Sequence, residues 1–275
     1  MSNSLLNSKI VKKQNKSYNR RVERNRLIYY EATADQAFWD RHWRDNFSDK
    51  MYDRAERGFL DQFESIFTRY LPKNALILEA GCGLGQFVLA LGARGYTIEG
   101  VEWGRETVEF AHKHYPDLPV KVGDVTKLDV PDGYYSAYIS IGVWEHRRNG
   151  PDPFVKEAVR IIKPGGIGLI SVPYFNPLRR LKAWLGFYQD NVEGLDFYQY
   201  AYSKNEFAEI LEHGGLHVVE SVVLSPYKGI TDEISLLRWL DRWLLSRLLI
   251  QAILSLPIFR KFGHSILFVC NKTVI

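Results

Sequence analysis

A loop with three alternating glycines constrains the fold of this chain more than any other feature. The loop, Glu79-Ala80-Gly81-Cys82-Gly83-Leu84-Gly85, follows the short apolar run Ala75–Leu78 and precedes a helical pattern over Gln86–Ala93. Glycine lets the backbone turn sharply and lets a ligand approach without a Cβ in the way. A helix that starts there presents unpaired backbone N–H groups to the ligand. The loop therefore indicates a strand–turn–helix unit that binds a ligand.

The spacing of the glycines separates two kinds of nucleotide site. The dinucleotide fingerprint is Gly-x-Gly-x-x-Gly, whereas here Gly85 comes one position early and Gln86 occupies the fingerprint position. No Lys-Ser or Lys-Thr pair accompanies the loop, which argues against a nucleoside triphosphatase. A nicotinamide-dependent oxidoreductase stays open as a less favoured alternative.

Strand and helix patterns alternate between residues 75 and 172. Such alternation predicts right-handed crossovers and a parallel sheet. The chain has 275 residues, which suits one large α/β domain with additions. The further strands expected are Tyr96–Val101, Val120–Val122, Tyr135–Ile141, Ile167–Val172, Leu216–Leu224 and Ser265–Val269, and the helices between them include Glu106–His114 and Asp152–Ile162.

Two acidic residues stand where strands of this sheet should end. Glu102 ends the second strand about twenty residues after the loop, where a carboxylate can accept both ribose hydroxyls of an adenosine. Asp124 follows the third strand and is placed to meet an adenine amino group, while Val125 can pack on the ring. Either carboxylate alone would read as an ordinary loop residue, but both together behind this loop favour an adenosine site.

At these positions the sequence resembles the class I S-adenosylmethionine (SAM)-dependent methyltransferases. Leu78–Gly85 looks like the first motif of that superfamily. Four further segments agree in order and spacing, and the resemblance covers roughly residues 75–172 and, more loosely, residue 200 to the end. These segments are Val101-Glu102, Gly123-Asp124-Val125, Ile141–His146 and Arg160–Gly166.

The resemblance implies a Rossmann-like, doubly wound α/β fold. Its seven-stranded sheet would be mostly parallel with an antiparallel last strand, Ser265–Val269, beside Leu216–Leu224. An α-helical insertion precedes that last strand. The motifs are specific for the superfamily but say little about the molecule that is methylated.

The resemblance also implies SAM as cofactor and S-adenosylhomocysteine as product. Glu79 and the Gly81–Gly85 backbone would meet the methionine end, Glu102 the ribose and Asp124 the adenine. Glu102 is more usually Asp in the family, and Gly104 stands where a Ser or Thr cap is frequent. The expected cofactor residues are Glu79, Ala80, Gly81, Cys82, Gly83, Gly85, Glu102, Trp103, Asp124, Val125, Ile141 and Gly142.

One histidine follows the fourth strand, near the point where the methyl group should emerge. An oxygen or protonated nitrogen acceptor has to lose a proton, and histidine is a suitable base near neutral pH. We therefore take His146 as the candidate base; the alternative is that His146 and Glu145 only brace the loop. Aromatic residues from two flanking regions are expected to close over the acceptor: Trp39, Trp43, Tyr174, Tyr198 and Tyr200.

The pattern divides the chain into a basic flexible N-terminal arm, 1–26, and a methyltransferase domain, 27–275. Within the domain we expect a helical, aromatic lead-in (27–74), a substrate loop (173–202) and a helical insertion (232–262). Arg57–Tyr70 has the spacing of an amphipathic helix. Ser203 and Glu206 read as a capping box that opens a later helix.

The acceptor is only loosely defined by the sequence. The absence of an Asn/Asp-Pro-Pro-Tyr motif after strand four disfavours nucleic acid, and we expect a small-molecule or lipid- or glycan-linked acceptor methylated at oxygen. A catalytically silent SAM-binding partner subunit is the non-enzyme alternative. The leucine- and tryptophan-rich segment 232–262 would serve as a lid, a dimer face or a peripheral membrane contact.

The cysteines and the N-terminus bear on metal content and cell compartment. Cys82 and Cys270 are the two cysteines, far apart in sequence, and no metal-ligand cluster is evident, so we expect no disulfide and no metal. The N-terminus lacks the apolar core of a secretory signal, and no apolar run reaches about twenty residues. We expect a cytoplasmic protein that is peripheral to the membrane if 232–262 contacts lipid.

Overall fold

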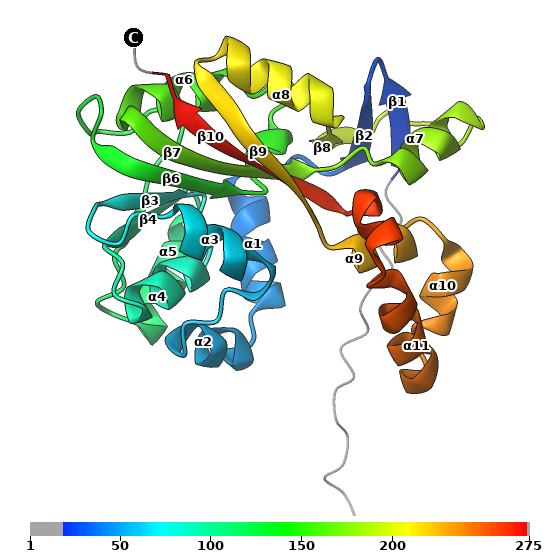
Figure 1. Ribbon diagram of the computed structural model, residues 1–275, viewed down its shortest axis with the longest axis horizontal. Helices are drawn as coiled ribbons and strands as arrows, with labels where there is room; N and C mark the ends of the chain where they lie inside the picture. Colours follow the sequence, from blue (N-terminus) through cyan, green and yellow to red (C-terminus); the bar gives the residue numbers. More distant parts are fainter. Residues whose placement is uncertain (1–18, 274–275) are drawn as a thin grey trace, which may run out of the picture.

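Seven strands form one sheet at the centre of the computed structural model, which describes residues 19–273 (Figure 1). The strand order is β5-β4-β3-β6-β7-β10-β9, and β10 runs antiparallel to both of its neighbours. The Rossmann-like fold with an antiparallel last strand is therefore confirmed. The strands are β3 (Ile77–Ala80), β4 (Ile98–Glu102), β5 (Val120–Val122), β6 (Tyr135–Ile141), β7 (Ile162–Pro173), β9 (Leu216–Leu224) and β10 (Ser265–Lys272).

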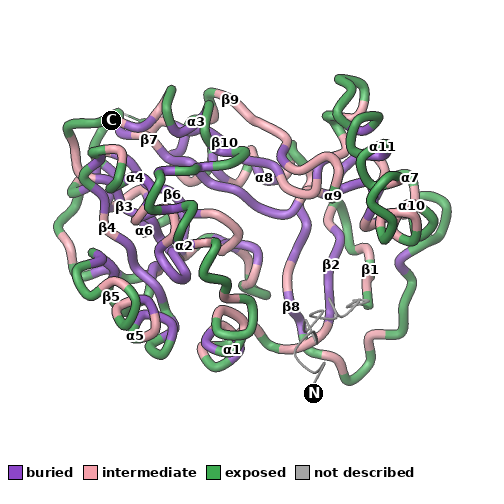
Figure 2. Tube along the Cα trace, turned by 90° about the horizontal axis from the view of Figure 1, so that it is seen from below, coloured by how far each residue is buried: buried purple, intermediate pink, exposed green. Residues whose placement is uncertain are grey.

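Helices cover both faces of this sheet. One face packs against α6 (Asp152–Ile161) and α8 (Lys204–His213), the other against α3 (Glu64–Tyr70), α4 (Gln86–Ala93) and α5 (Arg105–His114). Because both faces are covered, the central strands are mostly apolar, and their few polar side chains, such as Glu79 and Ser140, are buried as well. Figure 2 shows buried residues along these strands and exposed ones along the outer helices. Half of the expected capping box is present: Ser203 Oγ accepts the Glu206 backbone N–H at the start of α8, but the Glu206 side chain accepts from Arg26 instead.

A second, three-stranded sheet corrects two of the expectations. It pairs β1 (Asn19–Glu23), β2 (Arg26–Glu31) and β8 (Asp196–Ala201) in the order β1-β2-β8, all antiparallel. Residues 19–26 of the expected flexible arm are therefore ordered as part of the β1–β2 hairpin, because β2 continues into the buried residues 27–30. The rest of the expected arm, residues 1–18, lies outside the described residues.

The segment 173–202 is likewise not an irregular loop. It contains α7 (Pro177–Trp184) and β8. The Asn176 side chain accepts the Arg179 backbone N–H, and Pro177 takes the first helical position, which together start α7. The strand forms because residues 26–31, far away in the sequence, supply its partner.

The lead-in, residues 27–74, is largely helical, but its helices have other bounds than the sequence pattern predicted. It comprises α1 (Gln36–Asn46), α2 (Asp49–Glu56), the short 3-10 turn η1 (Asp61–Phe63) and α3. The helix expected from Arg57 begins only at Glu64, because Gly58 and Asp61 have φ values of 72° and 49°, outside the helical region.

The insertion before β10 is helical, as expected. It is built from α9 (Pro226–Thr231), α10 (Ser235–Leu240), α11 (Leu244–Leu254) and the 3-10 helix η3 (Pro257–Phe262), and α11 ends shortly before Pro257. In Figure 1 these helices form a lobe at one end of the molecule, beside α7. Among residues 19–273, none of the helices has both the length and the apolar character needed to cross a bilayer.

Candidate functional site

The glycine loop joins β3 to α4 with three left-handed residues. Gly81, Gly83 and Gly85 have φ values of 77°, 56° and 73°. A Cβ on Gly83 would lie 2.3 Å from the indole of Trp43, and one on Gly81 would lie 2.4 Å from Val143. Glycine is therefore required here both for backbone conformation and for the close approach of α1 and of the segment after β6.

Glu102 at the end of β4 links the glycine loop to the loop that follows β4. Its Oε2 accepts the backbone N–H of Gly83 at 2.9 Å and its Oε1 that of Gly104 at 2.9 Å. Burial raises the pKa of Glu102, while these backbone N–H groups lower it in part. A buried carboxylate thus holds two loops at the carboxyl edge of the sheet, beside the switch in strand order between β3 and β6, where open α/β sheets bind ligands.

A cavity of about 240 Å³ opens at this edge. Expected cofactor residues line it from four strand ends: Gly81, Glu102, Trp103, Asp124, Val125, Ile141 and Gly142. Three further expected residues, Trp39, Trp43 and His146, also face it. The structure therefore brings together the sequence motifs that follow β3, β4, β5 and β6.

Other expected cofactor residues lie behind the cavity wall. Glu79, Ala80, Cys82, Gly83 and Gly85 are not among its lining residues. Glu79 is buried beneath the loop, and burial raises the pKa of its carboxyl well above the usual range. Its Oε2 has no hydrogen-bond partner. A buried acceptor without a partner is costly, so a donor supplied by a ligand would remove that cost.

Asp124 shapes the loop after β5. Its Oδ1 accepts both the backbone N–H of Thr126 at 2.8 Å and the Thr126 hydroxyl at 2.7 Å, an Asx turn. The adjoining Val125 is buried and contributes an apolar surface to the cavity. This pairing of a carboxylate with an apolar side chain suits a flat, polar-edged ring.

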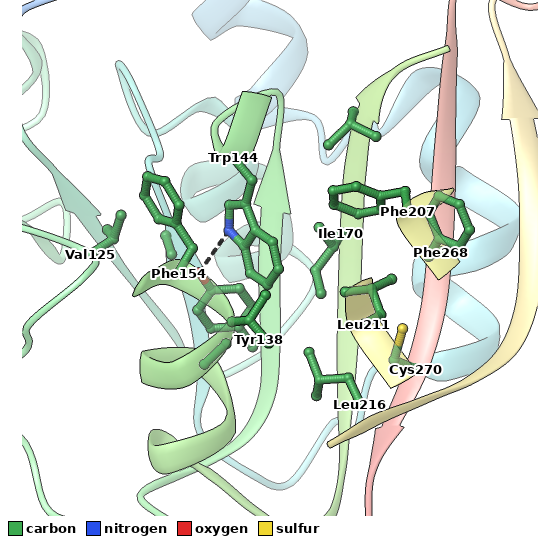
Figure 3. Packing of buried hydrophobic residues seen from close by; sticks show 14 of the residues in the cluster. Val125, Tyr138, Trp144, Phe154, Ile170, Phe207, Leu211, Leu216, Phe268 and Cys270 are labelled. Carbon is green, nitrogen blue, oxygen red and sulfur yellow. Dashed lines mark hydrogen bonds between the residues drawn. The ribbon is translucent and has the colours of Figure 1, made fainter. Parts of the chain in front are cut away.

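A fully buried tryptophan anchors the turn η2 (Trp144–His146) that follows β6. The Trp144 indole stacks on Phe154 with ring centroids 6.0 Å apart, and its Nε1 donates to the Tyr138 hydroxyl at 3.4 Å (Figure 3). These contacts fix Trp144 between the sheet and α6. The next two side chains, Glu145 and His146, are thereby held at a defined place beside the cavity.

His146 is oriented by a backbone carbonyl from the second sheet. Its Nδ1 lies 2.9 Å from the Tyr198 carbonyl oxygen, which accepts only, so Nδ1 carries the proton and Nε2 a lone pair. Trp39 packs edge-on against the imidazole with centroids 4.8 Å apart. Burial lowers the pKa of His146 to about 4, so the ring is neutral at physiological pH.

Glu145 is a buried acid that the sequence identified only as a brace. Burial raises its pKa to about 8. Its Oε1 lies 3.8 Å from His146 Nε2 and 3.5 Å from the place of a Cβ on Gly142, and its Oε2 has no hydrogen-bond partner. A carboxyl group that is protonated near neutral pH therefore stands beside the candidate base.

Three tyrosines expected in the acceptor pocket lie elsewhere. Tyr174, Tyr198 and Tyr200 do not line the cavity. Tyr198 and Tyr200 are buried in β8, because they pack in the second sheet; the Tyr200 hydroxyl donates to the Arg148 carbonyl oxygen at 2.8 Å. Tyr198 still contacts His146 in two ways: its carbonyl oxygen orients the imidazole, and its ring packs edge-on against it with centroids 4.9 Å apart.

Several lining residues were not expected. Ala34 comes from the chain before α1, and Arg147 follows His146 directly, where the basic pair Arg147-Arg148 was the available signal. Arg147 is exposed and adds a cation to the rim. The other unexpected lining residues are Thr126, Val143 and Phe154.

Comparison with known proteins agrees with this geometry. Residues 78–170 match the family model described as "Methyltransferase domain". A 2-methyl-6-phytyl-1,4-hydroquinone methyltransferase of Synechocystis is 32% identical over 37% of this chain and 33% of its own length. A ubiquinone biosynthesis O-methyltransferase of Alkalilimnicola ehrlichii is 28% identical over 40% of this chain and 46% of its own length. The chain thus spans less than half of either relative.

The fold recurs among solved structures. A chain from the complex between the Haloferax volcanii Trm112 methyltransferase activator and a methyltransferase superposes with a TM-score of 0.59. It is 20% identical, and the match covers 86% of this chain and 98% of that one. The matched sequence segment, residues 78–170, contains the glycine loop, Glu102, Asp124 and His146, whereas the lining residues Ala34, Trp39 and Trp43 lie outside it.

Proposed function

Because this chain belongs to the class I SAM-dependent methyltransferase superfamily, we propose that it transfers a methyl group to an oxygen atom of an apolar small-molecule or lipid-linked acceptor. SAM is the methyl donor of that superfamily. When bound, SAM supplies a methyl group activated by its sulfonium, and the protein supplies alignment and a dry site.

The residues present fit SAM. Gly81 of the glycine loop lines the cavity, Glu102 presents a carboxylate on the cavity wall, and Glu79 holds a buried oxygen without a hydrogen-bond partner. We assign the ribose to Glu102, the adenine to Asp124 and Val125, and the methionine end to the glycine loop with Glu79. Ile141 and Gly142 then border the reacting methyl group.

The orientation of His146 carries the proposal that the chain is an enzyme. The Tyr198 carbonyl fixes the proton on Nδ1 and leaves the Nε2 lone pair available beside the cavity. In this role Nε2 would take the proton of the acceptor hydroxyl, whose oxygen would receive the methyl group that bound SAM supplies, with S-adenosylhomocysteine as the leaving group. Trp39 and Trp43 from α1 cover the same cavity and exclude water from it.

Two observations support the proposed acceptor class: the walls of the cavity and the activities named for two relatives. Four aromatic side chains line the cavity, which suits a flat apolar ring; they are Trp39, Trp43, Trp103 and Phe154. The relatives named above are a hydroquinone methyltransferase and a ubiquinone O-methyltransferase. We therefore favour a phenolic or hydroquinone ring on an apolar tail as the acceptor.

Two measurements test this function. Calorimetric titration with S-adenosylhomocysteine, with NAD in parallel, should give micromolar binding of the former alone; binding of NAD alone would point to an oxidoreductase. Incubation with radiolabelled SAM and a panel of catechols and prenylated hydroquinones should then give a labelled ether. Binding of S-adenosylhomocysteine without turnover on any phenol would favour the silent partner subunit.

A further inference from the structure

Helix α11 is apolar on its outer face as well as on its inner face. Ile250 and Leu254 are buried against the rest of the insertion, whereas Leu245, Leu248 and Leu249 on the opposite side are exposed, Leu245 to 82%. The polar residues of α11 are Ser246, Arg247 and Gln251, so most of the helix surface is apolar. Helices that are apolar on both faces are normally buried on both, and the exposed leucines of α11 therefore indicate a covering partner outside the residues described.

The neighbouring helices extend this surface. Trp184 at the end of α7 is 80% exposed, and Trp239 of α10, Trp243 before α11 and Ile258 of η3 are exposed as well. Both views place α10 and α11 side by side, and α7 lies at the same end of the molecule (Figures 1 and 2). We call the exposed apolar side chains of α7, α10, α11 and η3 the apolar helical face. Soluble monomers rarely expose apolar patches of such extent.

An ion-pair cluster holds α7 against the insertion. Glu233 accepts from Arg179 at 3.0 Å, from Lys182 at 2.9 Å and from the Tyr188 hydroxyl at 2.6 Å. Leu178 of α7 also packs against the buried cluster of Ile230, Ile250 and Leu254. The apolar helical face is therefore built on a fixed base, with its four helices already in place.

The charges around this face indicate what covers it. Residues 234–262 contain five basic side chains and one acidic side chain, Asp241, which is paired with Arg247. Arg242, Arg260 and Lys261 are exposed, and so is Arg180 on α7. Basic residues beside exposed Leu and Trp complement an anionic lipid headgroup layer over an apolar interior.

We propose that the apolar helical face docks on the surface of an anionic lipid bilayer. The Leu, Ile and Trp side chains insert into the headgroup and acyl boundary, with the Arg and Lys side chains on the lipid phosphates. The inference rests on this surface alone and holds whether or not the chain transfers methyl groups. If it does, docking would bring the enzyme to acceptors that are dissolved in the membrane.

Vesicle flotation of the full chain tests the proposal. We expect flotation with vesicles of phosphatidylglycerol and phosphatidylcholine in equal parts, and at least about tenfold weaker binding to phosphatidylcholine alone. The double variant Leu245→Glu/Leu248→Glu should lose binding by at least about tenfold, because two charges replace inserted apolar side chains. Both side chains are exposed, so the fold should be kept; circular dichroism and thermal melting check this.

A matched control and sedimentation velocity decide the outcome. Val219→Glu changes an exposed valine on β9, outside the apolar helical face, and should float like the wild type. Absence of flotation of the wild-type chain overturns the proposal, and so does equal binding by the double variant. A stable homodimer that the double variant dissociates would show that a second copy covers this face instead.

Discussion

At the scale of single residues, Glu102 has two tasks. It holds the backbone N–H groups of Gly83 and Gly104, and in the proposed function it also receives the ribose. A hydrogen bond to a charged group contributes about 1.5–3 kcal/mol. Glu102→Ala should therefore weaken S-adenosylhomocysteine about tenfold to a hundredfold in calorimetry. The control is Glu106→Ala, which removes an exposed carboxylate in the first turn of α5 and should bind as the wild type does.

His146 carries the second residue-scale prediction. His146→Asn should lower kcat by about 10²–10⁴-fold, the usual contribution of a positioned base, while the dissociation constant of S-adenosylhomocysteine stays unchanged. Single-turnover assays beside calorimetry measure both quantities. A variant with full kcat would remove the base role and leave His146 as a support for Trp39.

The pKa of His146 also predicts the pH dependence of that rate. Burial lowers this pKa to about 4, so Nε2 is largely unprotonated near neutral pH. The kcat/KM of the wild type should therefore show no acid limb near 6.5, where an ordinary histidine titrates. If kcat/KM of the wild type fell below pH 6.5 and this fall were absent in His146→Asn, the low pKa would be contradicted, but the role of His146 as general base would still be supported.

At the scale of elements, the sequence predicted what is local. The glycine loop, the strands from β3 to β6 and the Ser203 cap each rest on a short pattern of residues, and each is present. The second sheet was not predicted, because β2 pairs with β8 some 170 residues away: Leu27 faces Ala201 and Ile28 faces Tyr200. The local sequence of neither segment predicts that it pairs with the other.

The same dependence on long-range contacts explains which site residues could be predicted from the sequence and which could not. Residues that follow the strands of the main sheet were predicted, since the fold alone places Gly81, Glu102, Asp124 and Gly142 at one edge. The tyrosines of β8 were misplaced in the pocket, because their burial depends on pairing with β2. Glu145 was underrated for a related reason, since its pKa depends on burial that only tertiary packing creates.

The junction between α7 and the insertion gives a prediction at this scale. Removing one partner of a buried ion pair costs about 3–5 kcal/mol, because the other charge stays buried and uncompensated. Glu233→Gln should therefore lower the free energy of unfolding by about 3 kcal/mol, since Arg179 is buried. Urea denaturation measures it, with the exposed Glu193→Gln as control; an unchanged midpoint would contradict the assigned role.

The acid stability of the protein should follow the same residue. Burial opposes ionisation of Glu233, but the charges of Arg179 and Arg20 with the Tyr188 and Lys182 hydrogen bonds lower its pKa to about 2. A lowered folded pKa gives stability that is present above the unfolded pKa, near 4.5, and is lost as the pH falls toward 2. Urea titrations between these pH values should show that loss in the wild type and less of it in Glu233→Gln.

At the scale of the whole molecule, cofactor binding should stabilise the entire fold. The cavity is built from loops after β3, β4, β5 and β6, so ligand contacts there link most of the central sheet. Product at a hundredfold excess over its dissociation constant adds about 2.7 kcal/mol. S-adenosylhomocysteine should thus raise the melting temperature by about 5 °C, and NAD should not. Equal shifts with both would point to a less selective site.

The position of β10 has a consequence for synthesis of the chain. This strand lies between β7 and β9, yet it follows both of them and the helical insertion in sequence. On the ribosome, β7 and β9 therefore emerge with open edges and no strand between them, and the sheet closes only after residue 272 has left the exit tunnel. The apolar helices of the insertion emerge during that interval. Chaperones, or a nearby membrane, would meet the nascent chain at its most aggregation-prone stage.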